Sequence, residues 1–383
     1  MDGRYDQYSG ATLRTAQVAS TDPDAMARIG QALGDDLALV CLFAAPDADF
    51  TKLTRDAAIW FPSSDVLACT TAGELGAQGY ETGQIVAVGF PSMLFEAATL
   101  VIEGLDQLNE PALIDRLIAQ RMDLTRRAPA MTSEFAFTLI DGLSQREEYL
   151  TAVLSSALGP VPLFGGSSGD GQDFGRTLLS RNGEVFQNAA LVATLRSHCP
   201  VEVFSLDHLE PIDTRMVVTK ADPATRTVLE INAAPAAQEY ARLLGLNPVD
   251  LDPYTFAAHP VAVRLGQSHH VRAIQHVEAG GALRFFSAID EGMVLSLTRP
   301  QDIVEHLDRS LTHLARNAAP DYILGFDCLL RRMDAGRGQQ ERAVSAVLRA
   351  HNVVGFSTYG EQIGGLHVNQ TLTGVAIFPP VGP

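Results

Sequence analysis

Short runs of apolar residues recur along the chain at a spacing that predicts parallel strands joined by helices. Three of these runs occupy residues 37–43, 135–140 and 322–326. Each is followed about 30 residues later by a second apolar run, an interval that accommodates a strand, a crossover helix and a second parallel strand. The connecting helices are expected at residues 49–61, 145–158 and 339–351. The last of them has apolar residues three and four positions apart, which is typical of an amphipathic helix.

A small polar turn follows the second strand of each unit and repeats in all three. Its copies are residues 67–74 (LACTTAGE), 163–170 (LFGGSSGD) and 353–361 (VVGFSTYGE). Each copy combines apolar or small residues, a pair of hydroxyl residues, a glycine and an acid. A further apolar strand follows each copy, at residues 84–90, 189–195 and 371–378. The sequence therefore predicts one unit used three times, with hydroxyls and free backbone N–H groups gathered at strand ends.

The segments outside these units predict two domains of different construction. Strands are expected at residues 14–19 and 210–219, and helices at residues 23–33, 111–127 and 302–318. Antiparallel strands are expected from alternating apolar and polar side chains at residues 259–265, 271–277 and 283–289. Gly280 and Gly281 form a good hairpin turn before the last of them. The predicted fold is α/β with mixed sheets, in a first domain at residues 1–222 and a second domain, opened by this antiparallel section, at residues 223–383.

Composition and charge narrow the classes of function. The chain has 383 residues, of which 46% are hydrophobic, and a formal charge of −17. No Lys/Arg cluster that would neutralise phosphates is visible, so we expect no nucleic-acid partner. Neither a signal-peptide pattern nor a run of about 18 apolar residues is present, so no membrane insertion is predicted. The four cysteines form no CxxC pair, which favours a reducing compartment and a cytoplasmic protein.

The hydroxyl turns supply the first candidate binding residues. Hydroxyls and neighbouring N–H groups at a strand end can hydrogen-bond a polar ligand, and the acids can bind an ammonium group or a cation. The ligand-binding residues predicted on this basis are Ser167, Ser168, Asp170, Ser357, Thr358, Glu361 and Asn369. The structural alternative is that the hydroxyls only close turns and cap helices, and that the acids belong to capping boxes.

Motifs typical of catalysis are incomplete in these turns. The glycine-rich second copy lacks the Gly-Lys-Ser/Thr end of a P-loop, and the chain has no GxGxxG. Residues 166–169 are one residue short of a GxSxG elbow, and the sequence marks no partner histidine. The HExxH pattern of zinc enzymes is absent as well. We therefore expect a protein that is not an enzyme, with a serine hydrolase using Ser167 or Ser168 as an alternative.

Several of these motifs resemble the FIST family, which pairs an N-terminal and a C-terminal sensory domain. The resembling segments are residues 68–74, 164–171, 355–361 and 367–374. Further segments resemble landmarks of the C-terminal domain, namely residues 234–237 with Tyr240, His259 with Pro260, and Cys328 with Arg331. The resemblance covers roughly residues 30–378. It implies a sensor of small ligands, for which amino acids are the early proposal.

A chain with two such domains and this length also resembles the NosP group, whose members are haem-binding nitric oxide sensors. That resemblance implies partners in trans, either a histidine kinase or a cyclic-di-GMP enzyme. No kinase, PAS, GGDEF or methyl-accepting segment is attached, so we expect the output to pass through a separate protein.

Four residues of the second domain are candidates for holding haem. Haem needs an axial nitrogen ligand, an apolar slot and usually cations for its propionates. His259 lies between apolar segments and is the predicted metal ligand, with His367 as a second cofactor-binding histidine. Arg264 and Arg272 are the predicted partners of the propionates. Because no CxxCH is present, the expected cofactor is a non-covalent haem b. Each histidine can equally be a structural group.

The sequence is thus interpreted as a non-catalytic cytoplasmic sensor that binds a small-molecule or gas ligand. The most specific version of this hypothesis is a haem-based nitric oxide sensor that regulates a histidine kinase or a cyclic-di-GMP enzyme. An amino-acid or metabolite sensor without haem is the alternative, and the serine hydrolase is a third hypothesis. The oligomeric state stays open, with a homodimer among the options.

Overall fold

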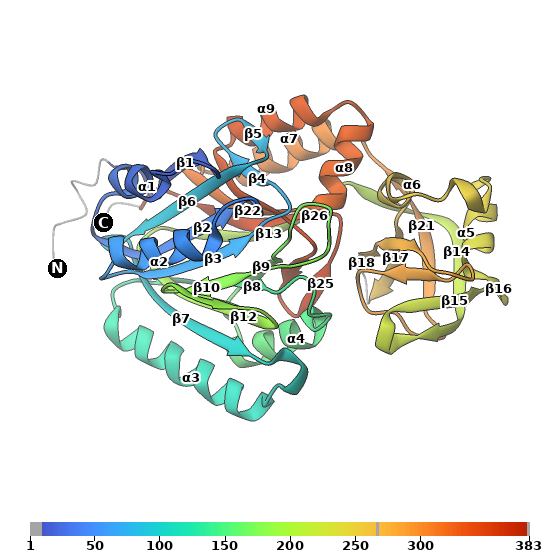
Figure 1. The fold of residues 1–383 in the computed structure, drawn as a ribbon, viewed down its shortest axis with the longest axis horizontal. Coiled ribbons are helices and arrows are strands. Elements are labelled where there is room, and N and C mark those ends of the chain that lie inside the picture. The colour runs from blue at the N-terminus through green and yellow to red at the C-terminus, as the bar shows by residue number, and fades with distance from the viewer. Residues whose placement is uncertain (1–9, 266–267, 381–383) are drawn as a thin grey trace.

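The apolar runs form the central strands of a large body, to which a smaller lobe is attached (Figure 1). The structure is a computed structural model and describes residues 10–265 and 268–380. The body comprises residues 10–207 and 301–380, and the second lobe comprises residues 209–300. The chain therefore leaves the body after its second repeated unit and returns before the third.

Within the described residues, the body contains three six-stranded sheets that are built alike. The first has the order β1 (Arg14–Ala19), β6 (Gln84–Pro91), β2 (Leu37–Ala44), β3 (Asp65–Thr70), β10 (Leu179–Arg181) and β11 (Glu184–Phe186). The second has the order β7 (Phe95–Glu103), β12 (Ala189–Ser197), β8 (Ser133–Ile140), β9 (Leu163–Ser167), β24 (Glu361–Ile363) and β25 (Leu366–Val368). The third has the order β13 (Val201–Asp207), β26 (Thr371–Ile377), β22 (Tyr322–Cys328), β23 (Val353–Thr358), β4 (Glu74–Gly76) and β5 (Gly79–Glu81).

The predicted parallel pairs are confirmed at the centre of all three sheets. β2 pairs with β3, β8 with β9, and β22 with β23, each in parallel register. The last strand of each unit, β6, β12 or β26, lies antiparallel beside the first. These central strands are buried along almost their whole length, and this burial on both faces explains why they read as continuous apolar runs.

A short hairpin after each hydroxyl turn leaves its own unit and completes the sheet of another. Hairpin β4–β5 pairs with β23 of the third unit, β10–β11 with β3 of the first, and β24–β25 with β9 of the second. This exchange is cyclic, so the three units are locked into one body. The division expected at residue 222 stays a prediction about the sequence domains, but strands from both sides of it share the second and third sheets.

Helices lie on the outside of the body (Figure 1). They are α1 (Ala25–Leu33), α2 (Phe50–Trp60), α3 (Glu110–Arg127), α4 (Glu147–Leu158), α7 (Ile303–Leu314), α8 (Leu329–Arg337) and α9 (Glu341–Ala350). The three predicted crossover helices are confirmed as α2, α4 and α9. Three of the helices of the body begin at capping side chains. Asp49 accepts the amide of Lys52 (3.0 Å) before α2, and Asn109 accepts that of Ala112 (3.2 Å) before α3. Asp302 accepts the amides of residues 304 and 305 (2.9 Å each) before α7. The short helix α8 was not predicted.

Aromatic side chains from all three sheets meet in a shared core. Phe43 stacks on Phe356 with ring centroids 4.8 Å apart, and Phe326 contacts Phe356 at 4.9 Å. Phe164 lies 5.3 Å from Phe326. All four side chains are fully buried. Such close packing fixes the three sheets relative to one another, and with them the turns at their ends.

The second lobe is a largely antiparallel sheet, as the alternation of side chains predicted, but the strand expected at residues 271–277 is divided between two strands at opposite ends of the strand order. Its strand order is β18 (Ser268–Arg272), β17 (Val261–Leu265), β21 (Val294–Pro300), β14 (Leu209–Asp222), β15 (Thr227–Ile231), β20 (Leu283–Phe285) and β19 (Ile274–Val277), with β16 (Ala234–Pro235) beside β15. Its helices are α5 (Ala236–Leu244) and α6 (Pro253–Ala258). The strand expected to reach residue 289 ends at Phe285, because Ser287 and Ala288 hydrogen-bond to Asn369 and Glu148 of the body instead.

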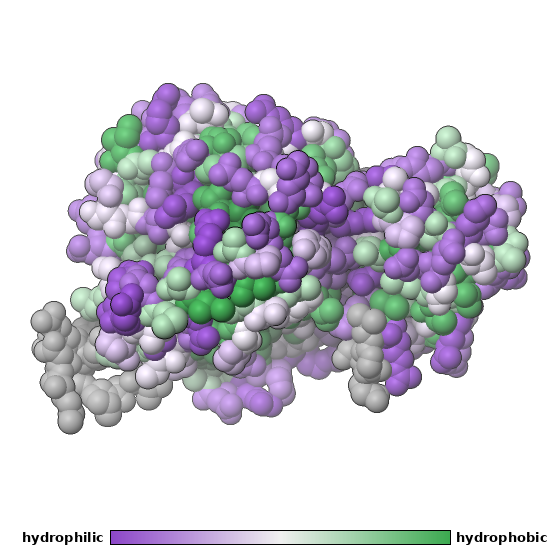
Figure 2. Space-filling model, turned by 90° about the horizontal axis from the view of Figure 1, so that it is seen from below, coloured by the Kyte–Doolittle hydropathy of each residue, from purple (hydrophilic) through white to green (hydrophobic). Residues whose placement is uncertain are grey.

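The surface mixes hydrophilic and hydrophobic side chains over the face shown in Figure 2. Among the helices of the described ranges, none is both long enough and apolar enough to cross a bilayer.

Candidate functional site

The three hydroxyl turns meet at one end of the body. Each turn donates at least one backbone N–H to a carbonyl of another turn, and three of these hydrogen bonds link the turns in order. These three hydrogen bonds run from Gly169 to Thr70 (3.1 Å), from Ala72 to Ser357 (2.9 Å) and from Tyr359 to Ser167 (3.2 Å). Because the bonds form a closed cycle, the turns hold one another in place. We call residues 70–73, 167–170 and 357–360 the turn ring.

The three serines of the turn ring are fully buried, and two of them form side-chain hydrogen bonds with other parts of the protein. The hydroxyl oxygen of Ser167 accepts from Nε2 of Gln362 (3.1 Å), and the hydroxyl of Ser168 donates to the carbonyl of Ile140 (3.2 Å). Oγ of Ser357 has no hydrogen-bond partner in the described part of the chain. These contacts support the turn-closing alternative, and ligand binding by the three serines stays a prediction.

Asp170 orders the loop that follows the second turn. Its Oδ2 accepts the amides of Gly175 (2.8 Å) and Arg176 (2.6 Å), and its Oδ1 accepts the hydroxyl of Tyr359. The ring of Tyr359 also stacks on Phe174, with centroids 4.4 Å apart. The carboxylate therefore closes the loop over the turn ring and leaves little of its surface for a ligand.

Glu361 clamps the third turn to the strand that follows it. Its carboxylate accepts the hydroxyl of Thr358 at one oxygen, and the amide (3.2 Å) and hydroxyl (2.8 Å) of Thr371 at the other. The side chain is fully buried, and burial raises its pKa to about 8 although these donors oppose the shift. Glu361 thus joins the turn to the start of β26.

A similar clamp is formed in the first unit by Glu74, and in the second by Asp141, an acid that lies outside the hydroxyl turn. Glu74 accepts the hydroxyl of Thr71 (2.5 Å) and the amide of Gln84 (3.1 Å), at the start of β6. Burial raises the pKa of Glu74 to about 7. In the second unit Asp141 takes this role and accepts the amide of Asn188, next to β12, at 2.6 Å. These acids are therefore part of the architecture of each unit.

Replacing Glu361 with glutamine is expected to remove a pH dependence of stability. The pKa of Glu361 is about 8 in the folded protein against an ordinary value of 4.5. The folded state therefore holds this proton more tightly than the unfolded state, and the stabilisation is complete below pH 4.5 and is lost as the pH rises towards 8. We expect Glu361→Gln to gain stability over the native protein across this window, measured by urea unfolding.

The matched control for this experiment is Glu184→Gln, because Glu184 is an exposed glutamate on β11. This variant should keep the pH profile of the native protein. A profile of Glu361→Gln that runs parallel to the native one from pH 4.5 to 8 would contradict the prediction.

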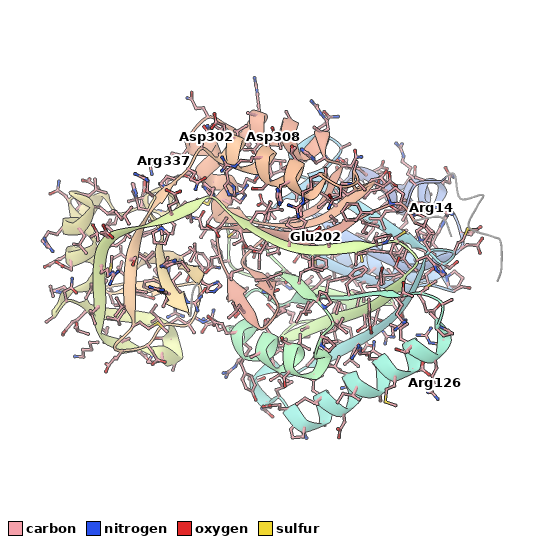
Figure 3. All side chains as sticks on the ribbon, turned by 180° about the vertical axis from the view of Figure 1, so that it is seen from behind. Arg14, Arg126, Glu202, Asp302, Asp308 and Arg337 are labelled. Atoms are coloured by element: carbon pink, nitrogen blue, oxygen red, sulfur yellow. The ribbon has the colours of Figure 1, made fainter. Side chains whose placement is uncertain are left out.

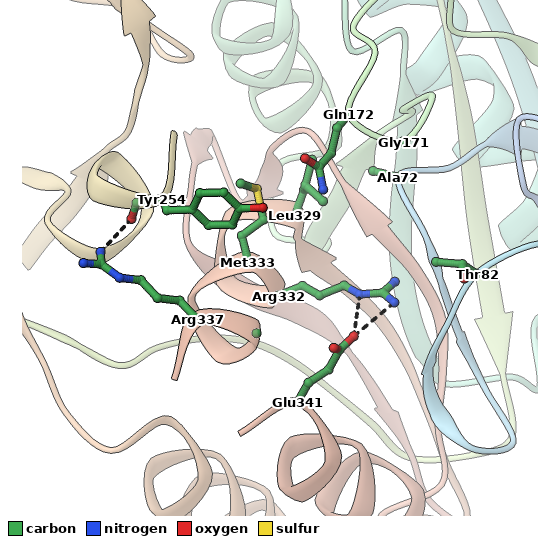
Figure 4. A pocket seen from close by; sticks show the side chains of 11 residues that line it. Ala72, Thr82, Gly171, Gln172, Tyr254, Leu329, Arg332, Met333, Arg337 and Glu341 are labelled. Carbon is green, nitrogen blue, oxygen red and sulfur yellow. Dashed lines mark hydrogen bonds and ion pairs between the residues drawn. The ribbon is translucent and has the colours of Figure 1, made fainter. Parts of the chain in front are cut away.

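A cleft of about 630 Å³ lies beside the turn ring, between α8 and α6 of the second lobe (Figure 4). It is lined by Ala72, Thr82, Gly171, Gln172, Tyr254, Leu329, Arg332, Met333, Gly336, Arg337 and Glu341. Ala72 belongs to the turn ring and Gly171 follows it directly, so the cleft opens over the strand ends. Tyr254 is the contribution of the second lobe, so both parts of the molecule form the walls.

Arg332 is the most firmly held charge in the cleft. Its Nη1 donates to the carbonyl of Glu81 (2.9 Å), and its guanidinium lies over the ring of Tyr80, 5.1 Å from the centroid. Its Nε donates to Glu341 at 3.2 Å. The side chain of Arg332 is 13% exposed and that of Glu341 is 46% exposed. A ligand carboxylate could therefore replace Glu341 on a guanidinium that is already oriented.

Arg337 lies at the other end of α8 and ties this helix to the second lobe. Its Nη1 donates to the backbone carbonyl of Tyr254 at 3.0 Å. Figure 4 shows the side chains of Tyr254, Leu329 and Met333 between the two arginines. The cleft thus offers two cations separated by an apolar surface, with one carboxylate at its edge.

None of the binding residues predicted from the sequence lines this cleft. The sequence reasoning missed Arg332, Arg337 and Glu341, which lie on and just after α8. A signal was present, because Cys328 and Arg331 resemble family landmarks and α8 starts directly after Cys328. The predicted Asn369 lies elsewhere, fully buried, where its Oδ1 accepts the hydroxyl of Ser287.

The two histidines named for haem do not line the cleft. His367 is 3% exposed, and its Nδ1 lies 3.1 Å from Nε2 of Gln362. His259 is half-buried at the end of α6, and its carbonyl accepts the hydroxyl of Tyr240. Burial lowers the pKa of both imidazoles.

The two arginines named for haem lie in different surroundings. Arg272 is 8% exposed, and its Nη1 donates to the carbonyl of His367 at 3.3 Å. Arg264 is exposed on β17 and lines a separate cavity together with His269. In the described part of the chain, Arg264 therefore lies in a cavity of its own, whereas Arg272 and His367 contact each other elsewhere. The residues that the structure describes contain no group of three His, Cys, Asp or Glu side chains that would hold a metal ion.

Two family models match the chain, and together they cover most of it. The FIST N domain matches residues 38–234, and the FIST C domain matches residues 236–364. The two matches meet within the second lobe, next to β16. No curated protein sequence matches the chain.

Proposed function

Because the chain belongs to the FIST family, with a FIST N and a FIST C domain, we propose that it senses a small ligand in the cleft between the turn ring and the second lobe. FIST domains are sensory domains that bind small ligands in signal transduction. This points to a non-enzymatic role, and the full burial of Ser167 and Ser168 speaks against a serine nucleophile.

The observation that carries this proposal is the geometry of Arg332. The guanidinium of Arg332 is held by the backbone carbonyl of Glu81 and the ring of Tyr80. Its remaining N–H donors therefore point in a fixed direction, which suits a carboxylate or a similar anionic group. The apolar side chains of Leu329 and Met333 would cover the carbon skeleton of such a ligand. An amino acid or a small carboxylate metabolite therefore fits the cleft better than a purely apolar compound.

Replacing Arg332 with alanine is expected to weaken anion binding by about 10- to 100-fold, which corresponds to the loss of a hydrogen bond to a charged group. Isothermal titration of the full chain with L-glutamate, L-aspartate and succinate measures the effect. Glu341→Gln should bind the same compounds more tightly, because the competing carboxylate is gone.

The control is Arg299→Ala, since Arg299 forms an exposed ion pair with Glu210 on the second lobe, outside the cleft. It should bind as the native protein does. If none of the three compounds binds to the native protein, or if Arg332→Ala binds them unchanged, the proposed ligand class is wrong.

The haem version stays a prediction, motivated by the resemblance to the NosP group. The dispersed positions of His259, His367 and Arg264 weaken it. The absorption spectrum of the protein purified from haem-supplemented cells is its direct test, and the absence of a Soret band after haem titration would reject it. The partner that reads the signal is proposed to be a histidine kinase or a cyclic-di-GMP enzyme in trans.

A further inference from the structure

The chain crosses between the body and the second lobe at one joint. The outgoing strand passes through His208, between β13 and β14, and the returning strand passes from β21 to Gln301. The amide of Gln301 donates to the carbonyl of His208 at 2.7 Å, so the two crossings lie side by side. Figure 3 shows the outgoing chain running from the strand that carries Glu202 into the second lobe. These two strands are the covalent connections between the body and the second lobe, and side-chain contacts such as those of Ser287 with Asn369 accompany them.

A buried row of polar side chains ends at this joint. Nδ1 of His208 lies 3.1 Å from Nη1 of Arg331, whose Nε lies 3.0 Å from Oδ1 of Asp327. The other oxygen of Asp327 accepts the hydroxyl of Tyr80. Nε2 of His208 lies 3.1 Å from the carboxylate of Asp334. We call Tyr80, Asp327, Arg331 and His208 the buried relay.

The protonation pattern of the buried relay follows from its partners. Asp334 can only accept a hydrogen bond, so Nε2 of His208 carries the proton and Nδ1 accepts from Arg331. Burial lowers the pKa of His208, which keeps the imidazole neutral beside the charged Arg331. Because Asp327 and Arg331 are at most 1% exposed, neither can find a solvent partner if the relay shifts.

The opposite end of the buried relay lies under the cleft. The ring of Tyr80 carries the guanidinium of Arg332 on its face, while its hydroxyl bonds Asp327. Arg331 and Arg332 are neighbours on α8, and one points into the buried relay while the other lines the cleft. A ligand carboxylate that replaces Glu341 on Arg332 would therefore act on a guanidinium that lies over the first residue of the buried relay.

A second histidine lies on the helix that follows the joint. His306 is on α7, the first helix after the returning strand, and both Arg331 and His208 contribute to lowering its pKa after burial. In the described part of the chain, Nδ1 of His306 and Nη2 of Arg331 are buried without a hydrogen-bond partner. Among the described residues, Arg331 therefore has His208 as its imidazole partner and keeps one buried donor without a partner.

We propose that the buried relay transmits occupancy of the cleft to the joint, so that ligand binding sets the orientation of the second lobe. The proposal rests on the cleft being the sensory site. A change at Tyr80 or Asp327 alters the bond between Arg331 and His208, and with it the packing of the two strands at the joint. A partner protein would then read the position of the second lobe.

The orientation of the second lobe is measurable by energy transfer between two dyes on the full chain. Ile59 of the body is 73% exposed and Val249 of the second lobe is 91% exposed, so Ile59→Cys and Val249→Cys provide the attachment points. The native cysteines Cys41, Cys69, Cys199 and Cys328 are buried and should not react. Succinate serves as the probe ligand, and isothermal titration follows its binding separately.

Two conservative changes interrupt the buried relay. Tyr80→Phe removes the hydroxyl and keeps the ring under Arg332, and His208→Gln keeps hydrogen-bonding groups at the joint. We expect both to change the transfer efficiency without ligand and to lose the change that succinate causes, while succinate binding by His208→Gln stays within about tenfold of native. Tyr149→Phe and His276→Gln are matched controls at exposed positions, and they should behave as the native protein.

The outcomes separate this proposal from the proposed function. If succinate binds and both relay variants keep the native response, the relay has no transmitting role and the proposal is overturned. If succinate does not bind the native protein, the proposed class of ligand is wrong. The transfer efficiencies measured without ligand then test the relay independently. Unchanged ligand-free efficiencies in both variants would overturn the proposal in that case.

Discussion

Replacing Gly355 with alanine is expected to prevent the body from folding stably. Gly355 lies in β23 with φ at +151°, a conformation that L side chains rarely adopt, and it pairs with Gly325 in the parallel ladder. A Cβ at this position would lie 1.9 Å from the carbonyl oxygen of Gly325. The contact is with backbone at the centre of a sheet, so no side chain can move to relieve it. We expect a loss of more than about 4 kcal/mol of unfolding free energy.

Urea unfolding followed by far-UV circular dichroism and by the fluorescence of Trp60, the single tryptophan, measures this loss. The matched control is Gly245→Ala, because Gly245 also has a positive φ (+73°) but nothing lies within 4 Å of the added Cβ. The control should cost only about 1–2 kcal/mol, the strain of a left-handed residue. Equal losses in the two variants would show that the clash at Gly355 is relieved, and would contradict the prediction.

Replacing Arg331 with methionine is expected to destabilise the protein by about 3–5 kcal/mol. Arg331 is fully buried and forms an ion pair with Asp327, which is 1% exposed. Removing the guanidinium leaves the carboxylate of Asp327 with the hydroxyl of Tyr80 as its remaining close partner among the described contacts. A buried charge without its counter-ion has lost its hydration and the attraction of its partner. The resulting loss of unfolding free energy is larger than the net stabilisation that the intact ion pair provides.

Two further variants test that reasoning. The double variant Arg331→Met with Asp327→Leu removes both charges and should recover much of the loss. Arg299→Met breaks an ion pair with Glu210 in which both side chains are largely exposed, and it should cost at most about 1 kcal/mol. Urea unfolding measures all three, and a loss for Arg331→Met no greater than that for Arg299→Met would rule the argument out.

The repeated units could be predicted because their signal is local. A run such as residues 37–43 is apolar at nearly every position, and the strand it forms, β2, is buried along nearly its whole length. Helix α9 is amphipathic over its own sequence, since Val344 and Leu348 face the core. These properties depend on neighbours within one element, so the order of strands and helices is readable before any contact is known.

The pairing of the hairpins could not be predicted in the same way. Each hairpin strand, such as Glu74–Gly76, has three residues, and its partner strand Val353–Thr358 lies in another unit. Three residues carry too little pattern to select one sheet edge among three similar ones. The choice is made by the packing of whole sheets against the shared phenylalanine core.

Part of the candidate site could likewise be predicted from the sequence, and part could not. The hydroxyl turns were visible as a repeat, but the sequence does not show that Ser167 is buried or that Glu361 serves its own strand. The cleft residues are separated by long stretches of chain. Arg332 stands in a short polar helix whose sequence signal is confined to the family landmarks Cys328 and Arg331 at its start. Only the folded chain brings Arg332, Gln172 and Tyr254 to one cavity.

By itself, the sequence determined that the chain builds three strand–helix–strand units with polar turns at their strand ends, and that these units belong to a sensory family. The tertiary structure decided that the turns close on one another and that the cleft lies beside them. It also decided that a buried relay joins the cleft to the second lobe. The physical reason is one of range. Periodicity and apolar runs act between neighbours in the chain, whereas cavities and buried charge pairs are made by residues that only packing brings together.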